Sequence, residues 1–236
     1  MANPWFRFKQ FQIRQDGPGF KVGTDGVLLG AWADITGVNA ILDVGTGTGL
    51  LALMLAQRCK AKLIALEISK PSYEQAIENV NASPWKDRIT ILHCPVQDFM
   101  AEQKFDLIIS NPPFFHDSYK PTDKNKIISR HDDTLSLEEL AMAAIRNLNA
   151  KGKLCLVLPL EESRDFERIS FEKGLFLHRV LEIRPTPRHS IKRRLMEFRL
   201  CQAQSVIHED LTIEYGKRHD YTDQYRDMCK DFYLAF

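Results

Sequence analysis

The chain has 236 residues, a hydrophobic fraction of 44%, a charged fraction of 27% and a formal net charge of +1. This composition is typical of a globular protein with a sizeable core, and it excludes a disordered chain or a general polycation. The five cysteines contain no C-x-x-C pair, and the first residues lack the apolar run of a signal peptide. We therefore expect reduced thiols and a cytoplasmic location, without disulfides, a metal centre or a membrane span.

From residue 40 onward, short apolar runs alternate with segments of helical periodicity. This alternation is typical of a mostly parallel sheet with helices on both faces. Two late apolar runs have no helix between them, so they predict an antiparallel hairpin at the sheet edge. The expected strands are residues 40–44, 62–67, 89–93, 105–110, 153–158, 176–183 and 195–203, and the expected helices are residues 50–58, 70–81, 137–148 and 163–173.

These elements predict a Rossmann-like α/β fold with a seven-stranded sheet. We expect a single domain over residues 1–236, with short extensions at residues 1–35 and 204–236. No repeat, low-complexity segment or interdomain linker interrupts the pattern. Ser136 and Glu139 form an S-x-x-E capping box, which marks the start of the third helix.

A glycine-rich turn follows the first strand of the sheet. Asp43, Gly45, Gly47 and Gly49 form the pattern D-x-G-x-G-x-G at the transition from strand to helix. Glycine allows positive φ angles and lets a ligand approach the backbone, and ligands bind at the carboxyl ends of such strands. Leu50 stands where a dinucleotide fingerprint needs glycine or alanine, and the spacing instead resembles the glycine motif of class I methyltransferases. The alternative is a purely structural turn.

Two acidic residues follow the next strands. Glu67 ends the second strand, where a carboxylate can accept hydrogen bonds from both hydroxyls of a ribose. Asp98 follows the third strand and suits the amino group of an adenine. We include their neighbours Ile68 and Phe99 in the predicted nucleoside site. Alternatively, Glu67 favours the start of the following helix, and Asp98 forms a turn.

The tetrad Asn111, Pro112, Pro113 and Phe114 follows the fourth strand, again at a carboxyl end. An exocyclic amino nitrogen is a poor nucleophile because its lone pair is delocalised into the ring. The Asn111 side-chain oxygen and the Pro112 carbonyl can accept both amino hydrogens, and Phe114 can stack on the base. The arrangement predicts methyl transfer to such a nitrogen by positioning, without a separate base. The alternative is a rigid Pro-Pro turn.

Together these motifs resemble the class I methyltransferases that modify amino groups of nucleic acids. Within that class the chain is similar to the bacterial tRNA adenosine N6-methyltransferase family that modifies position 37 of a valine tRNA. The resemblance runs through residues 20–33, residues 83–85 and residues 221–234. It implies S-adenosylmethionine as the cofactor and the anticodon stem-loop of a tRNA as the partner, and it places four residues at the methionine end of the cofactor, namely Lys21, Gly23, Thr24 and Asp25.

The tetrad leaves other targets open. Many members of the family carry tyrosine where this chain has Phe114, and Phe114 with His116 brings the motif nearer to guanine N2-methyltransferases of ribosomal RNA. Those enzymes usually have an additional N-terminal domain, for which Asp43 comes too early. Glutamine N5-methyltransferases of proteins use the same tetrad, and a non-catalytic RNA-binding protein is a further alternative.

A cationic run near the hairpin is the candidate RNA-binding segment. On a near-neutral protein such a concentration of charge predicts phosphate contacts, although charges also discourage pairing of an edge strand. Phe6, Phe8 and Phe11 suggest core anchors rather than a stacking surface. We expect a monomer. The predicted RNA-binding residues are Arg184, Arg188, Lys192, Arg193 and Arg194 of this run, together with Arg130 of the long polar loop at residues 115–133.

Overall fold

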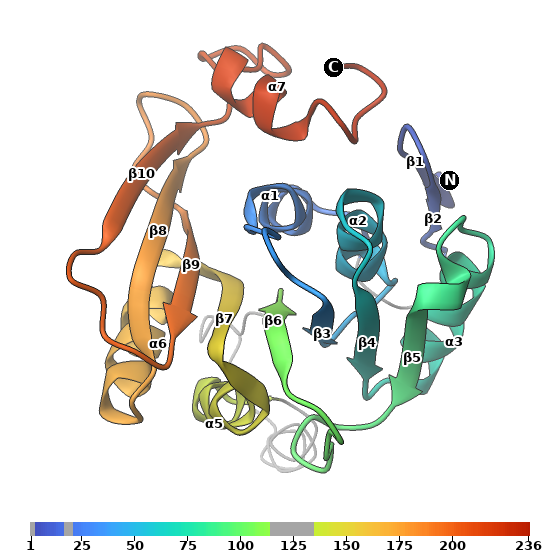
Figure 1. Cartoon of the computed structure of the whole chain (residues 1–236). Coiled ribbons are helices and arrows are strands. Elements are labelled where there is room, and N and C mark those ends of the chain that lie inside the picture. Colours follow the sequence, from blue (N-terminus) through green and yellow to red (C-terminus); the bar gives the residue numbers. More distant parts are fainter. Residues whose placement is uncertain (1–2, 17–20, 114–134) are drawn as a thin grey trace, which may run out of the picture.

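Figure 1 shows the computed structural model, which describes residues 3–16, 21–113 and 135–236. From residue 40 to residue 110, the observed strands and helices have the boundaries that apolar periodicity predicts. Short apolar runs became strands because both their faces are covered, and the longer amphipathic runs became helices. These elements are β3 (Ala40–Val44), α2 (Leu50–Arg58), β4 (Lys62–Glu67), α3 (Lys70–Asn81), β5 (Ile89–His93) and β6 (Phe105–Ser110), and a short helix that was not predicted, η1 (Lys86–Arg88), precedes β5.

The second half of the chain follows the expected order with shifted boundaries. The capping box opens the third predicted helix, because the Ser136 hydroxyl accepts from the Glu139 backbone and the Glu139 side chain accepts from Ser136. The next strand begins at Leu148, five residues earlier than expected, since Leu148 pairs with Phe105. The elements are α5 (Leu137–Asn147), β7 (Leu148–Pro159), α6 (Leu160–Glu172), β8 (Phe176–Arg184), β9 (Arg193–Arg199), β10 (Ile207–Thr212) and α7 (Asp223–Cys229).

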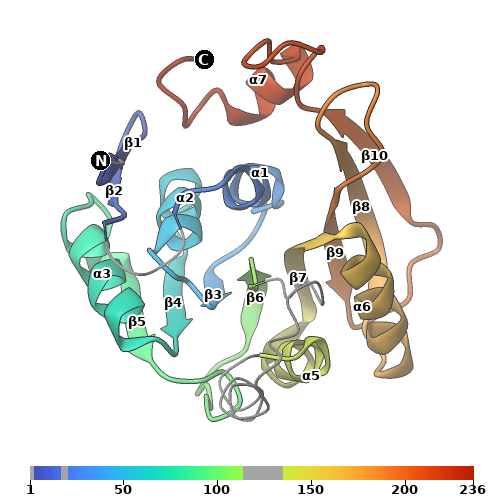
Figure 2. The same cartoon turned by 180° about the vertical axis from the view of Figure 1, so that it is seen from behind.

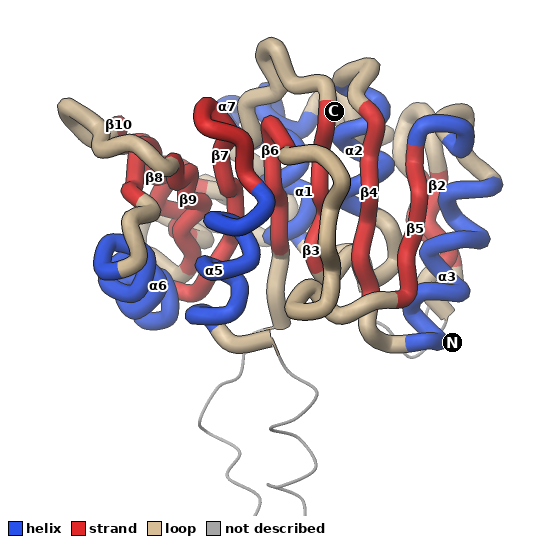
Figure 3. The backbone as a smooth tube through the Cα atoms, turned by 60° about the horizontal axis from the view of Figure 1, so that its bottom comes forward, coloured by secondary structure: helices blue, strands red, loops and turns tan. Residues whose placement is uncertain are grey.

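In the described part of the chain, the main sheet has eight strands in the order β10-β8-β9-β7-β6-β3-β4-β5. Strand β9 pairs antiparallel with β7 and β8, and the other pairs are parallel. Figure 3 shows the strands of the central part side by side. The α/β class and the antiparallel pair are confirmed, but the prediction of seven strands with that pair at the edge is wrong.

The missed strand, β10, lies parallel to β8 and forms the edge. It has three consecutive polar residues between Ile207 and Leu211, and Leu211 is its only buried residue. Period-2 alternation is therefore too weak in this segment to predict a strand. Its backbone carbonyls are partly covered by the C-terminal segment, since Thr222 Oγ1 donates to Thr212 O at 2.6 Å and Gln224 Nε2 donates to Asp210 O at 2.8 Å.

Two apolar clusters cover the two faces of the sheet. Successive residues of one strand belong to different clusters: Ile41 packs with α1 (Thr24–Trp32) and α2, whereas Leu42 packs with α5. Because side chains alternate across a strand, each central strand contributes to both clusters. Figure 2 shows α1 and α2 side by side on one face.

Helix α1 was not predicted, and close packing on α2 explains how its glycine-containing sequence forms a helix. A Cβ atom on Gly30 would lie 2.7 Å from Met54 Sδ, and one on Gly26 would lie 3.0 Å from Leu50 Cδ2. Gly26 and Gly30 are four residues apart, as are Leu50 and Met54, so both pairs lie along one helix–helix contact. The packing, rather than helix propensity, stabilises this segment.

The N-terminal arm packs against the C-terminal segment. Strands β1 (Trp5–Arg7) and β2 (Gln12–Arg14) form a separate two-stranded sheet. Phe8 stacks on Phe11 with ring centroids 4.6 Å apart, and both side chains are buried. Phe8 also forms a backbone bridge with Tyr233, and the Lys9 backbone N–H donates to Phe232 O at 2.9 Å. The interpretation of these aromatic residues as core anchors is confirmed. Within the described ranges, no helix has both the length and the apolar character needed to cross a bilayer.

Candidate active site

The glycine turn is fastened to the end of the neighbouring strand β4. The backbone N–H groups of Gly45 and Thr46 both donate to Leu66 O, at 3.0 and 2.9 Å. Gly47 has a φ of +57°, which a side chain would strain, while no atom lies within 4 Å of a Cβ placed there. The glycine is therefore required by the backbone conformation, and the space in front of it is open to a ligand.

Asp43 lies directly beneath this turn. It is completely buried, and its Oδ2 accepts a hydrogen bond of 2.5 Å from Thr46 Oγ1. Burial raises the pKa of Asp43 to about 7, and the negative charge of Glu67 acts in the same direction. Among the described residues, its Oδ1 atom has no hydrogen-bond partner. The contact of Asp43 with the turn is thus made through Thr46.

Glu67 joins the glycine turn to the segment that follows β4. Its Oε2 accepts from the Gly47 backbone N–H at 2.8 Å, and its Oε1 accepts from the Ser69 backbone N–H at 2.9 Å. The residue is 8% exposed. Each carboxylate oxygen has a second lone-pair site, so this buried anion can still accept hydrogen bonds from two further hydroxyl donors.

The other predicted nucleoside-site residues lie at the ends of β4 and β5. Ile68 is 49% exposed, and its carbonyl lies 2.8 Å from His93 Nε2. Asp98 is exposed in the turn after β5. Phe99 is buried, with its ring packed toward Phe105, so any ligand contact by Phe99 must come from its backbone. All of these residues lie on the carboxyl side of the sheet, as expected from the parallel strands.

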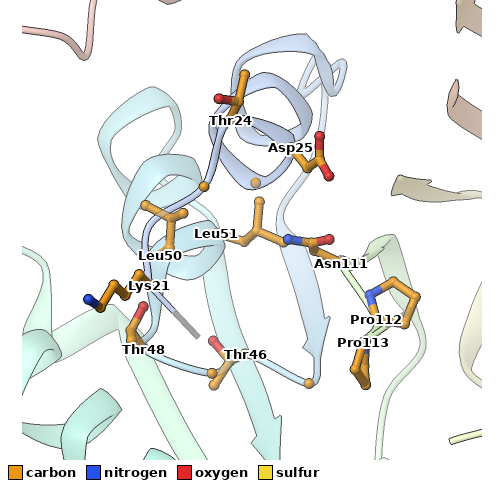
Figure 4. A pocket seen from close by; sticks show the side chains of 14 residues that line it. Lys21, Thr24, Asp25, Thr46, Thr48, Leu50, Leu51, Asn111, Pro112 and Pro113 are labelled. Atoms are coloured by element: carbon orange, nitrogen blue, oxygen red, sulfur yellow. The ribbon is translucent and has the colours of Figure 1, made fainter. Parts of the chain in front are cut away.

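A pocket of about 470 Å³ brings three distant segments together (Figure 4). One wall is the N-terminal part of α1 and the residues before it, the second is the glycine turn with the start of α2, and the third is Asn111, Pro112 and Pro113. Asp43, Gly49, Glu67, Ile68, Asp98 and Phe99 are not among its lining residues. The lining residues are Lys21, Gly23, Thr24, Asp25, Gly26, Gly45, Thr46, Gly47, Thr48, Leu50, Leu51, Asn111, Pro112 and Pro113.

Five of these lining residues are not among those that the sequence predicts. Gly26, Leu50 and Leu51 belong to the α1–α2 contact, and Thr46 and Thr48 lie between the glycines of the turn. The glycines four residues apart at positions 26 and 30 were the available signal for a tight helix contact. On its own this glycine spacing predicts a helix only weakly, because glycine lowers helix propensity.

The tetrad begins directly after β6. Ser110 Oγ donates to Val44 O at 2.8 Å inside the core, and this bond ties the end of β6 to the strand that carries the glycine turn. Asn111 is half-buried, Pro112 is buried and Pro113 is exposed. Phe114 lies outside the described residues. The tetrad and the glycine turn are therefore adjacent because β6 and β3 are neighbouring parallel strands.

The cationic run does not form one continuous surface. Arg194 is 7% exposed and pairs with Glu167 at 3.1 Å and Glu182 at 3.6 Å. Strand alternation in β9 directs this side chain to the face that α6 covers, so its guanidinium is not presented at the surface as expected. Arg184 pairs with Asp210 at 2.9 Å and remains partly exposed.

The remaining residues of the cationic run also differ from one another in exposure and in their partners. Arg188 and Lys192 are exposed in the loop between β8 and β9. Arg193 is directed to the pocket instead, where its Nε donates to Asp25 Oδ2 at 2.8 Å. Arg130 lies outside the described residues. In the ranges that the structure covers, no group of three or more histidine, cysteine or acidic residues could hold a metal ion.

Comparison with known proteins identifies the family. Residues 26–164 match the family model described as the methyltransferase small domain. The chain is 44% identical to the tRNA1(Val) (adenine(37)-N6)-methyltransferase of Trichodesmium erythraeum, with 100% of each chain covered. It is 45% identical to the protein of the same name from Christiangramia forsetii, with 99% of each covered.

Solved structures agree on the fold. A predicted O-methyltransferase of Agrobacterium tumefaciens matches with a TM-score of 0.62 at 20% identity, covering 88% of this chain and 96% of its own. The ribosomal protein L11 methylase of Lactobacillus delbrueckii matches with a TM-score of 0.55 at 18% identity, covering 76% and 80%. Such low identities support the class I methyltransferase fold alone. Through its full-length relatives and its family model, the chain belongs to the tRNA1(Val) (adenine(37)-N6)-methyltransferase family of methyltransferase small-domain proteins.

Proposed function

We propose that this protein transfers a methyl group from S-adenosylmethionine to the exocyclic N6 of an adenosine in tRNA, at position 37 of a valine tRNA. The observation that carries the proposal is the meeting of Asn111 and Pro112 with the glycine turn in one pocket. We also propose that residues 1–236 form a single domain and that the protein acts in the cytoplasm.

The residues that line the pocket and those beside it at the ends of β4 and β5 suit the cofactor. Lys21, Gly23, Thr24, Asp25, Gly45, Gly47 and Gly49 would hold its methionine end beside Asp43, and Glu67, Ile68, Asp98 and Phe99 would hold its nucleoside. The chemical support is the donor set, because Glu67 offers a buried carboxylate to ribose hydroxyls and the open turn at Gly47 admits a close ligand. When bound, S-adenosylmethionine supplies an electrophilic methyl group on a sulfonium.

The acceptor nitrogen is activated by hydrogen bonds from its own two hydrogens. The Asn111 Oδ1 and the Pro112 carbonyl accept one each, which withdraws the nitrogen lone pair from the ring and directs it toward the methyl group. Phe114 would stack on the base. Positioning supplies the rate, and the amino proton becomes acidic as the new bond forms, so it leaves to solvent without a dedicated base.

Substrate RNA would reach this pocket from the surface around the β8–β9 loop. Arg188 and Lys192 are exposed there and suit phosphate contacts, and Arg184 can join them at the cost of its surface pair with Asp210. Arg130 is a further candidate. An anticodon-loop adenosine is unpaired, so it can enter the pocket without disrupting a duplex.

The test is methylation of an unmodified valine tRNA transcript followed by mass analysis of its nucleosides. The expected product is N6-methyladenosine at position 37, and a transcript with guanosine at that position should remain unmodified. Asn111→Ala should lose methyl transfer by at least about 100-fold while retaining cofactor binding in calorimetry. N2-methylguanosine as the product would instead support the guanine alternative, and undiminished activity of Asn111→Ala would exclude the mechanism.

A further inference from the structure

Arg193 and Asp25 form an ion pair at the rim of the pocket. Arg193 is the first residue of β9 and lies opposite Ile183 at the end of β8, whereas Asp25 lies in the first turn of α1. Arg193 Nε donates to Asp25 Oδ2 at 2.8 Å, and both side chains are 29% exposed. The pair therefore joins the cationic end of the antiparallel strands to the wall of the pocket.

The pocket contains two charged side chains of opposite sign. Of its described lining residues, only Lys21 and Asp25 are charged. The amino-acid end of the proposed cofactor carries one carboxylate and one ammonium group, so a cation and an anion in the same pocket are complementary to it. Asp25 Oδ2 accepts a hydrogen bond from Arg193, so Oδ1 is the oxygen that can accept a hydrogen bond from the ligand.

We propose that Arg193 is a positioning residue of the methyl-transfer site, which fixes the Asp25 carboxylate to receive the ammonium group of the cofactor. The inference rests on the proposed function, and it assigns Arg193 to cofactor binding rather than to the phosphate-binding surface. A fixed carboxylate loses less side-chain freedom when the ligand binds, so Arg193 increases affinity without contacting the ligand itself.

The position of Arg193 distinguishes it from its neighbours in the cationic run. Arg188 and Lys192 are exposed, which suits contact with a polyanion. The Arg193 side chain is partly buried and its Nε points to an acid of the pocket. A phosphate at this place would share the guanidinium with Asp25, whose carboxylate already accepts from Nε.

The first experiment compares two ligands by calorimetry. S-adenosylhomocysteine carries the amino-acid end, whereas methylthioadenosine lacks it. We expect Arg193→Ala and Asp25→Asn each to weaken S-adenosylhomocysteine about tenfold and to leave methylthioadenosine within twofold. The double variant should be no weaker than Asp25→Asn alone, and Arg193→Lys should recover part of the affinity. Arg168→Ala, on the exposed face of α6, is the control expected to bind both ligands normally.

The opposite results would overturn the inference. Equal weakening of both ligands by Arg193→Ala would mean that Arg193 only supports the fold, and additive effects of the two variants would mean that the ion pair does not act as a unit. A role in RNA binding would appear as a raised KM for tRNA and a shallower salt dependence, as expected for Arg188→Ala. Because the calorimetry needs no RNA, it remains decisive even if tRNA is not the substrate.

Discussion

A Cβ atom on Gly26 would lie 3.4 Å from the side-chain nitrogen of Asn111, so the first turn of α1 is in contact with the first residue of the tetrad. The same Cβ would lie 3.0 Å from Leu50 Cδ2, which is closer than carbon atoms normally approach. The orientation of the Asn111 amide therefore depends on how closely α1 packs on α2.

Gly26→Ala should lower the turnover of bound substrate about tenfold while leaving the free energy of unfolding nearly unchanged. The new methyl group displaces Leu50 and confines the Asn111 amide, whereas the gain in helix propensity of about 1 kcal/mol offsets the strain. Single-turnover rates and urea unfolding measure the two effects separately. Wild-type turnover would show that the Asn111 amide does not depend on this contact.

Gly30→Ala is the matched change one helical turn further along α1. Its Cβ would lie 2.7 Å from Met54 Sδ and 3.1 Å from Met54 Cβ, and Met54 is fully buried. We expect a net loss of about 1–2 kcal/mol in the free energy of unfolding with normal turnover per folded molecule. A catalytic defect at unchanged stability would contradict this assignment.

Glu67→Gln tests the link between the glycine turn and β4. A glutamine can accept one of the two N–H groups of Gly47 and Ser69 but presents an amino group to the other. The free energy of unfolding should fall by about 1–3 kcal/mol, and S-adenosylhomocysteine should bind at least about tenfold more weakly. Glu74→Gln, which loses an exposed pair with Lys70 at 3.9 Å, should change stability by less than about 0.5 kcal/mol.

The buried Asp43 predicts a dependence of stability on pH. Burial raises its pKa from 3.8 to about 7 in the folded protein, so the native state retains a proton that the unfolded chain releases. The stabilisation from this group is fully present below about pH 4 and is lost as the pH rises to 7, at up to about 1.4 kcal/mol per pH unit. Asp43→Asn removes the titration, so urea unfolding should show this variant gaining stability relative to the parental chain across this range. Parallel pH profiles would refute the prediction.

Arg194→Ala and Arg188→Ala should separate structural from RNA-binding members of the cationic run. Removal of Arg194 leaves Glu167 and Glu182 without their buried partner, which should cost about 2 kcal/mol of stability with an unchanged KM for tRNA. Removal of Arg188 should raise that KM severalfold at unchanged stability. A raised KM for Arg194→Ala at full stability would restore Arg194 to the RNA-binding set.

The sequence predicted the elements that carry their own periodicity. Strands β3 to β6 and the helices between them have strong apolar patterns. The parallel arrangement then places Asp43, Glu67 and Asn111 near the carboxyl ends of neighbouring strands. Elements stabilised by distant contacts were missed. Helix α1 depends on α2, and β10 has a single buried residue against β8.

The same distinction applies to the candidate site. The tetrad and the glycine turn were predicted because each motif has its own local chemistry. The different roles of Arg193 and Arg194 were not predicted, since their partners, Asp25, Glu167 and Glu182, are distant in the sequence. A run of like charges says nothing about which members turn inward until the register of β9 is known.

The bridge between Phe8 and Tyr233 and the bond from Lys9 to Phe232 have a consequence for biosynthesis. A ribosome makes the N-terminal arm early, but Tyr233, whose ring stacks on Phe8, emerges more than two hundred positions later. During translation Phe8 and Phe11 thus lack their final neighbours, and the arm completes its packing only after the central sheet is available. Chaperones that bind exposed aromatic segments have their opportunity in that interval.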